Sequence, residues 1–174
     1  ALGSGSGGSP GGGWAATSAG VSGAAVPLAD VEGLDRSKVI TLGHSAGGHL
    51  AVLAAGRTRA TVPVAAAISQ AGVLDLIAAR DDSLGGGAVL ALMGDSDSYE
   101  AADPSAQIPL RVPVRCVHGE GDDIVPMSQS IGYVDRASAA GADAELVRVE
   151  GDHFVVIDPA SQAWVQTLEI LEAL

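Results

Sequence analysis

The sequence predicts an α/β protein in which a parallel β-sheet is flanked by helices. Short apolar segments that favour strands alternate with helical segments, and the links between them are short. One of these strands, over residues 62–69, is uniformly apolar, as is typical of a strand buried on both faces of a sheet. With 174 residues, 47% of them hydrophobic, the chain is long enough for one domain, which we place over residues 1–174.

The first part of the chain has no strand pattern. Residues 1–13 are almost entirely glycine and serine, which predicts a flexible loop. Residues 14–34 are rich in alanine and predict a helix, which Pro27 should kink or shorten and Gly33 should end.

The rest of the chain alternates between strands and helices. Strands are predicted over residues 39–42, 62–69, 112–117 and 144–149, and helices over 46–55, 88–93, 129–140 and 160–174. Residues 74–87 predict an irregular segment because three consecutive glycines interrupt it. The strand over 144–149 alternates in polarity and suits an edge position. The last helix is amphipathic, with an expected apolar side made of Trp164, Val165, Leu168 and Leu171.

Composition excludes several classes of function. The net charge of −12 would repel phosphates, so we expect no binding to nucleic acid or anionic membranes. Cys116 is the only cysteine, which rules out a disulfide within the chain. No apolar run reaches about 18 residues, and no segment resembles a signal peptide. These features predict a cytoplasmic protein, although the first residue is Ala1 and an earlier signal peptide stays open.

Three reactive side chains follow the predicted strands. Ser45 ends the first strand, Asp122 follows the third, and His153 follows the fourth. In parallel sheets, functional groups gather at the carboxyl ends of strands. A serine hydroxyl needs a nearby base, and a histidine base needs an acid to fix its tautomer. Ser45 also lies within Gly-x-Ser-x-Gly between a strand and a helix, where glycines 43 and 47 leave room for a tight turn.

These segments resemble the α/β-hydrolase superfamily, in particular its esterase and kynurenine formamidase-like members. Residues 43–49, GHSAGGH, resemble the nucleophile elbow, and residues 118–126, HGEGDDIVP, resemble the segment that carries the acid. Residues 151–154, GDHF, resemble the histidine loop. The resemblance implies Ser45 as nucleophile, Asp122 as acid and His153 as base, with the amide of Ala46 in the oxyanion hole.

The sequence departs from this family before the elbow. The family has several strands there and a loop that supplies a second oxyanion donor, whereas nothing before Val39 has a strand pattern. We therefore interpret the chain as the C-terminal part of the fold with its N-terminal strands missing. The elbow strand would then lie at an open edge, which either a preceding segment or a second copy of the chain should cover.

Other residues leave alternatives open. Asp123 adjoins Asp122 and could be the acid instead. A metal site formed by His118, Asp122 and His153 is conceivable, but the chain lacks the usual metal-binding spacings, and we expect neither a metal nor a cofactor. Leu74, Leu92 and Met93 lie where this superfamily often places its substrate cap and could line a pocket or pack in the core.

The sequence thus predicts a serine hydrolase that cleaves a small carboxylic ester or amide through an acyl-enzyme. Two alternatives remain. One is an amidase similar to arylformamidases. The other is a catalytically silent fragment that lacks a complete oxyanion hole.

Overall fold

The molecule is built on one parallel β-sheet. The computed structural model describes residues 13–24, 31–57, 62–94 and 99–174. Within them the four strands are β1 (Ile40–His44), β2 (Ala66–Gln70), β3 (Val114–Gly119) and β4 (Ala144–Val149). The sheet has the order β1-β2-β3-β4, with every neighbouring pair parallel. The carboxyl ends of all four strands therefore lie along the same edge of the sheet, as the sequence predicts.

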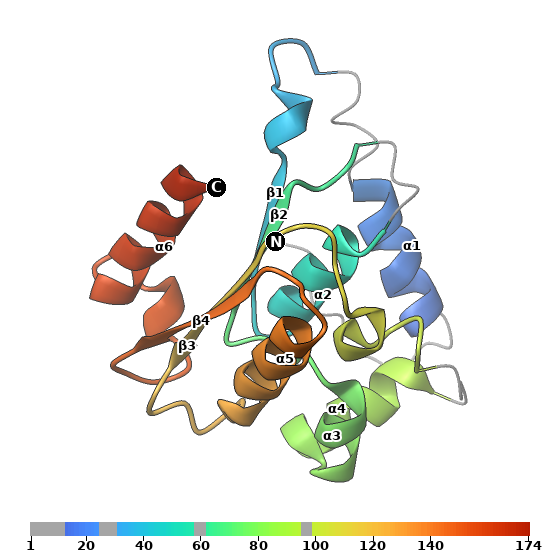
Figure 1. Ribbon diagram of the computed structural model, residues 1–174. Coiled ribbons are helices and arrows are strands. Elements are labelled where there is room, and N and C mark those ends of the chain that lie inside the picture. The colour runs from blue at the N-terminus through green and yellow to red at the C-terminus, as the bar shows by residue number, and fades with distance from the viewer. Residues whose placement is uncertain (1–12, 25–30, 58–61, 95–98) are drawn as a thin grey trace.

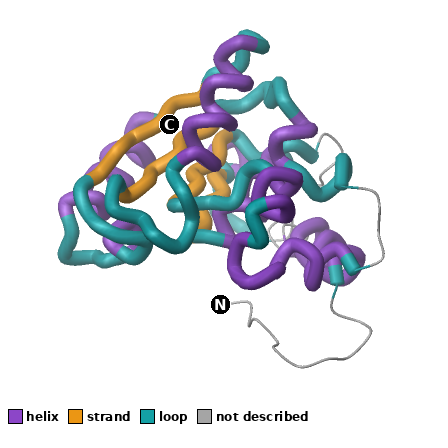
Figure 2. The backbone as a smooth tube through the Cα atoms, turned by 90° about the horizontal axis from the view of Figure 1, so that it is seen from below, coloured by secondary structure: helices purple, strands orange, loops and turns teal. Residues whose placement is uncertain are grey.

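Helices cover both faces of this sheet (Figure 1). The α-helices are α1 (Trp14–Ala24), α2 (Ala46–Ala55), α3 (Leu76–Asp81), α4 (Leu84–Met93), α5 (Ser128–Ala139) and α6 (Gln162–Ala173). Short 3₁₀ turns are η2 (Arg36–Lys38), η3 (Pro104–Gln107) and η4 (Val155–Ile157). Helices α2 and α5 lie on one face, and α6 lies on the other together with η4. Figure 2 views the chain from below, where loops cross in front of the strands.

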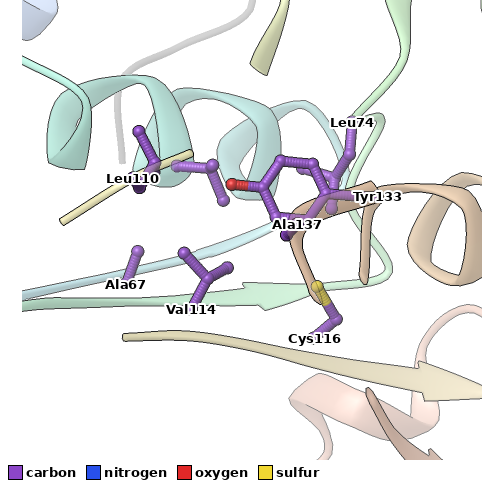
Figure 3. Packing of buried hydrophobic residues seen from close by; sticks show 8 residues of the cluster. Ala67, Leu74, Leu110, Val114, Cys116, Tyr133 and Ala137 are labelled. Carbon is purple, nitrogen blue, oxygen red and sulfur yellow. The ribbon is translucent and has the colours of Figure 1, made fainter. Parts of the chain in front are cut away.

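Each face has its own apolar core. On the first face, the Tyr133 ring of α5 lies over β3, against Cys116 and Val114, with Leu110 and Leu74 beside it (Figure 3). On the second face, Ile68 and Val117 of the sheet pack against Ala163 of α6. All five residues of β2 are buried, which confirms the prediction of a strand covered on both faces. At about 25 cal/mol per Å², burial of such side chains is the main stabilising contribution to the fold.

Several boundaries differ from the sequence prediction. Helix α2 and strand β4 have the predicted limits, but β2 begins at Ala66 rather than at residue 62, because Pro63 has no N–H to donate to the ladder. Residues 31–34 form a turn rather than the end of a helix, and residues 25–30, with Pro27, lie outside the described residues. Helix α3 was predicted as irregular. It forms because the Asp75 carboxylate accepts the Ala78 N–H and caps its first turn.

The buried side of α6 is also different from the predicted one. Its fully buried residues are Ala163 and Thr167, whereas Val165 and Leu168 are 42% and 44% exposed. The large side chains were expected to face the sheet, whereas Ala163 and Thr167, one helical turn apart, are the residues that do so. Leu171, at the C-terminal end, does pack against the core as predicted.

The two outer strands of the described sheet are β1 and β4. The polarity pattern correctly places β4 at an edge. Strand β1 is the other outer strand, with Leu42 40% exposed, and the expectation of an open edge beside the elbow fits this arrangement. None of the helices within the described ranges has the length and apolar character needed to cross a membrane.

Candidate active site

Ser45 lies in a strained turn between β1 and α2. Its φ of 56° and ψ of −121° lie in a region that a residue with a side chain rarely adopts, at a cost of about 1–3 kcal/mol. The turn persists because the Ser45 N–H donates to the Gln70 carbonyl at 2.8 Å, and the Ser45 carbonyl accepts the N–H of Gly48 at 2.9 Å. Ala46 is the first residue of α2, so its N–H has no partner in the preceding turn of that helix.

The glycines around Ser45 have different roles. A Cβ on Gly43 would collide with the carbonyl of Gly47, so this position requires glycine, as predicted. Gly47 itself has open space, and the prediction that it is needed for lack of room is wrong. The glycine that the sequence reasoning missed is Gly48, where a Cβ would lie 2.9 Å from the Cα of Gly72. The start of α2 therefore packs backbone against backbone on the loop after β2.

Asp122 lies in the loop that follows β3. Its Oδ1 accepts the N–H groups of Ile124 at 2.9 Å and Val125 at 2.8 Å, and its Oδ2 lies 2.7 Å from Nδ1 of His153. Burial opposes the charge on this carboxyl group, but the hydrogen bond from His153 and the two backbone N–H groups outweigh burial and lower the pKa of Asp122. The carboxylate is therefore ionised near neutral pH. The neighbouring Asp123 is exposed.

His153 lies in the loop after β4 and is 3% exposed. Because ionised Asp122 only accepts, Nδ1 of His153 carries the hydrogen of this bond, and Nε2 is the ring nitrogen that does not face Asp122. The two loops come together at Gly119, where a Cβ would lie 2.5 Å from the carbonyl oxygen of Asp152. Glycine is thus required at the end of β3 for the acid and the histidine to meet.

His44 connects the serine turn to the histidine loop. Its Nε2–H donates to the carbonyl of His153 at 2.9 Å, and the centres of the two rings are 4.4 Å apart. Burial lowers the pKa of His44, which keeps this ring neutral. Ser45 follows His44 directly, so the contact brings the serine turn beside His153. No hydrogen bond joins Ser45 Oγ to His153 within the described part of the chain.

Two further residues at this edge had no signal in the sequence. The buried amide of Gln70, at the end of β2, donates to the Val156 carbonyl in the histidine loop and to Thr167 Oγ1 of α6 at 3.3 Å. Phe154 is 55% exposed, and its ring centre lies 5.3 Å from that of His153. An exposed aromatic ring beside a histidine offers an apolar surface to a bound molecule.

The residues proposed for substrate binding do not form a pocket. Leu74 is fully buried against Tyr133, and Met93 is buried in a separate cluster with Leu76 and Val89, so both belong to the core. Leu92 is partly buried on α4. Surface cavities of about 470 and 280 Å³ lie on either side of Arg148, and neither is lined by Ser45, Asp122 or His153.

The buried histidines His49 and His118 both have hydrogen-bond partners. His49 donates from Nε2 to the Ala102 carbonyl at 2.7 Å, and burial lowers its pKa. Nε2 of His118 lies 2.9 Å from the Val125 carbonyl and 3.2 Å from Asp122 Oδ2. Across residues 13–24, 31–57, 62–94 and 99–174, no group of three or more histidine, cysteine or acidic side chains is arranged to hold a metal ion.

The strained serine turn, the parallel sheet and the histidine loop define an α/β-hydrolase fold, which the comparisons support. The sequence profile described as the prolyl oligopeptidase family matches residues 22–171. The chain therefore belongs to the prolyl oligopeptidase family, a family of serine hydrolases. No curated protein sequence matches the chain.

Solved structures agree on the fold. Esterase 2 of Thermogutta terrifontis, with butyrate bound, is 26% identical with a TM-score of 0.67, over 91% of this chain and 63% of the esterase. Dipeptidyl peptidase 4 of Porphyromonas gingivalis is 16% identical with a TM-score of 0.72, over 90% and 22%. Acylaminoacyl peptidase of Pyrococcus horikoshii is 18% identical with a TM-score of 0.65, over 80% and 23%. The chain thus spans about a quarter of these peptidases and three fifths of the esterase.

Proposed function

We propose that the chain carries the catalytic triad of a serine hydrolase, with Ser45 as nucleophile, His153 as base and Asp122 as acid. The observation that carries the proposal is the 2.7 Å hydrogen bond between Asp122 Oδ2 and His153 Nδ1, next to a serine in a strained strand-to-helix turn. In a neutral ring this pairing puts the hydrogen on Nδ1, so that Nε2 is the nitrogen available as a base for the serine.

The proposed substrates are carboxylic esters and small amides, including peptide bonds. Esters and peptides fit the printed names of the similar structures, an esterase bound to butyrate and an acylaminoacyl peptidase. Phe154 supports an apolar group on the substrate, because its exposed ring lies beside His153. An arylformamide has no such support among these structures and is included only as a substrate to test.

In the proposed reaction, Ser45 Oγ attacks the carbonyl carbon of the substrate while Nε2 of His153 takes the hydroxyl proton. The resulting oxyanion lies near the Ala46 N–H, at the positive end of α2. His153 then gives its proton to the leaving alcohol or amine, and an acyl group stays on Ser45. Water, deprotonated by His153, attacks this ester, releases the acid and restores the serine.

A fluorophosphonate probe that labels activated serines tests this proposal. An assembled triad predicts labelling of the Ala1–Leu174 chain at Ser45, and no labelling in Ser45→Ala or in heat-denatured chain. Turnover of short p-nitrophenyl esters, peptide p-nitroanilides and an arylformamide then separates the substrate classes. A folded chain that is neither labelled nor active would favour the silent alternative, which the position of β1 at the edge of the described sheet also supports.

A further inference from the structure

Oδ2 of Asp122, the oxygen that faces His153, also lies close to a second imidazole ring. His118, the fifth residue of β3, is fully buried, and its Nε2 lies 3.2 Å from Asp122 Oδ2. The same oxygen lies 2.7 Å from Nδ1 of His153. Two histidine rings, one from β3 and one from the loop after β4, therefore converge on one carboxylate oxygen.

The partners of His118 fix where its proton lies. Nε2 faces the Val125 carbonyl at 2.9 Å and the Asp122 carboxylate, which both only accept, so Nε2 must carry a hydrogen. Burial lowers the pKa of His118, so the ring is neutral and Nδ1 has a free lone pair. The hydroxyl of Ser130, on α5, lies 2.8 Å from Nδ1 and therefore donates to it. This bond polarises the ring and strengthens Nε2–H as a donor.

The Asp122 carboxylate is held at both oxygens by different groups. Oδ1 is fixed by the backbone N–H groups of Ile124 and Val125, and Oδ2 is shared by the two imidazoles. The backbone bonds act on Oδ1 alone, so the surroundings of Oδ2 are set by the two imidazoles. His118 Nε2–H donates to the Val125 carbonyl and lies beside Oδ2, with Nε2 at 3.2 Å from that oxygen.

We infer that His118 is a positioning residue of the site. Its Nε2–H fixes the orientation of the Asp122 carboxylate and withdraws part of the negative charge that Oδ2 presents to His153. The Ser130 hydroxyl supports this role through its hydrogen bond to Nδ1 of the same ring. The inference rests on the proposed function, because the effect on turnover requires that His153 be the base.

A purely structural role for His118 would consist of filling the core and holding the acid loop through Val125. The two roles differ in what they do to His153. Loss of the His118 N–H leaves the whole charge of Oδ2 directed at His153, which favours protonation of that ring. The charged and titratable groups around the pair include His44, which packs on His153, and Arg148, the β4 residue in register with His118.

The test compares His118→Leu, which removes the donor, with His118→Gln, whose amide reaches to about the same place. Val117→Ala is the matched control, because Val117 is equally buried on the same strand but faces the α6 side. The readouts are kcat and KM for a p-nitrophenyl ester, the pH dependence of kcat/KM, and the low-field NMR signal of the His153 Nδ1 proton.

We expect His118→Leu to lower kcat by about 10- to 100-fold with little change in KM, as a misdirected catalytic group does. The acidic limb of kcat/KM should move to higher pH, and the His153 proton signal should move to lower field. His118→Gln should restore most of each change. Val117→Ala should lower the melting temperature and leave both the pH profile and the proton signal in place. If His118→Leu behaves like Val117→Ala, the inference is overturned.

Two measurements distinguish failure of this inference from failure of the proposed function. In the unmodified chain, ¹⁵N NMR of His118 should show a neutral ring protonated at Nε2, and a ring protonated at Nδ1 would overturn the inference even if His118→Leu does not fold. If the chain shows no turnover that depends on Ser45, the proposed function fails, yet the His153 proton signal still reports on His118. If His118→Leu shows normal turnover and an unchanged His153 proton signal, the inference on His118 is contradicted while the proposed function stands.

Discussion

The two halves of the site are held in place by different means. Asp122 and His153 are positioned by hydrogen bonds, three of which converge on the Asp122 carboxylate, and His118 Nε2 lies 3.2 Å from the same carboxylate. Ser45 is positioned by its backbone, through a positive φ and a turn in which Gly43 has no room for a Cβ. The first half should therefore be sensitive to changes of polar side chains, and the second to added carbon atoms.

The largest effect is expected at Ser45, the proposed nucleophile. Ser45→Ala should reduce turnover of a p-nitrophenyl ester by about 10⁴- to 10⁶-fold, since loss of a triad member has effects of this size. The fold should be intact, because no hydrogen bond links Ser45 Oγ to His153 in the described structure. Steady-state kinetics and thermal melting measure the two quantities. Near-normal turnover in this variant would remove Ser45 from the reaction.

Substitution of Asp122, the proposed acid, should have the second largest effect on turnover, and substitution of Asp123 provides the control. Asp122→Asn should reduce turnover by about 10⁴-fold, because the neutral amide can stabilise the wrong tautomer of His153. Asp123→Asn changes an exposed side chain and should have little effect. Kinetics of both variants under one set of conditions decides between them. The reverse order would make Asp123 the acid, despite the hydrogen bond seen to Asp122.

Two glycine substitutions test the backbone half of the comparison. Gly43→Ala should lower the free energy of unfolding by about 1–3 kcal/mol, because the new Cβ meets the Gly47 carbonyl and the turn must shift. Gly47→Ala has open space at the start of α2 and should be neutral or stabilise by up to about 1 kcal/mol. Urea denaturation measures both. Equal tolerance at the two positions would show that the turn is held by something other than close packing.

The smallest effect concerns pH. Burial lowers the pKa values of His44, His49 and His118, so the folded chain takes up protons less readily than the unfolded chain, whose imidazoles titrate near about pH 6.5. The unfolded state then binds more protons below this pH, and the free energy of unfolding should fall as pH is lowered from about 7 to 5. Melting curves across this range check the prediction. His49→Gln, which keeps a donor for Ala102, should weaken the dependence, and stability that rises toward pH 5 would contradict it.

The residues of the candidate site can be predicted from the sequence more easily than the packing around them. Ser45, Asp122 and His153 stand out because local patterns place each at a strand end, and the order of the strands then brings those ends together. The buried face of α6 could not be predicted, because Ala163 and Thr167 are small or polar and the hydrophobic pattern of the helix does not single them out. The contact of Asp122 Oδ2 with both His118 and His153 could not be predicted either, because it depends on how β3 and the loop after β4 lie relative to each other in space.

The buried amide of Gln70 has a consequence for how the molecule comes apart on heating. It ties the end of β2 to the Val156 carbonyl and to Thr167 of α6, so the histidine loop and the last helix share one anchor. Proteins open in cooperative segments of unequal stability, and a helix with few buried residues, such as α6 with Ala163 and Thr167, belongs to the segments that open early. If α6 detaches from the sheet, the loop that carries His153 loses part of its support while β2 and β3 stay paired. Ester turnover should then disappear at a lower temperature than the far-ultraviolet circular dichroism of the remaining fold.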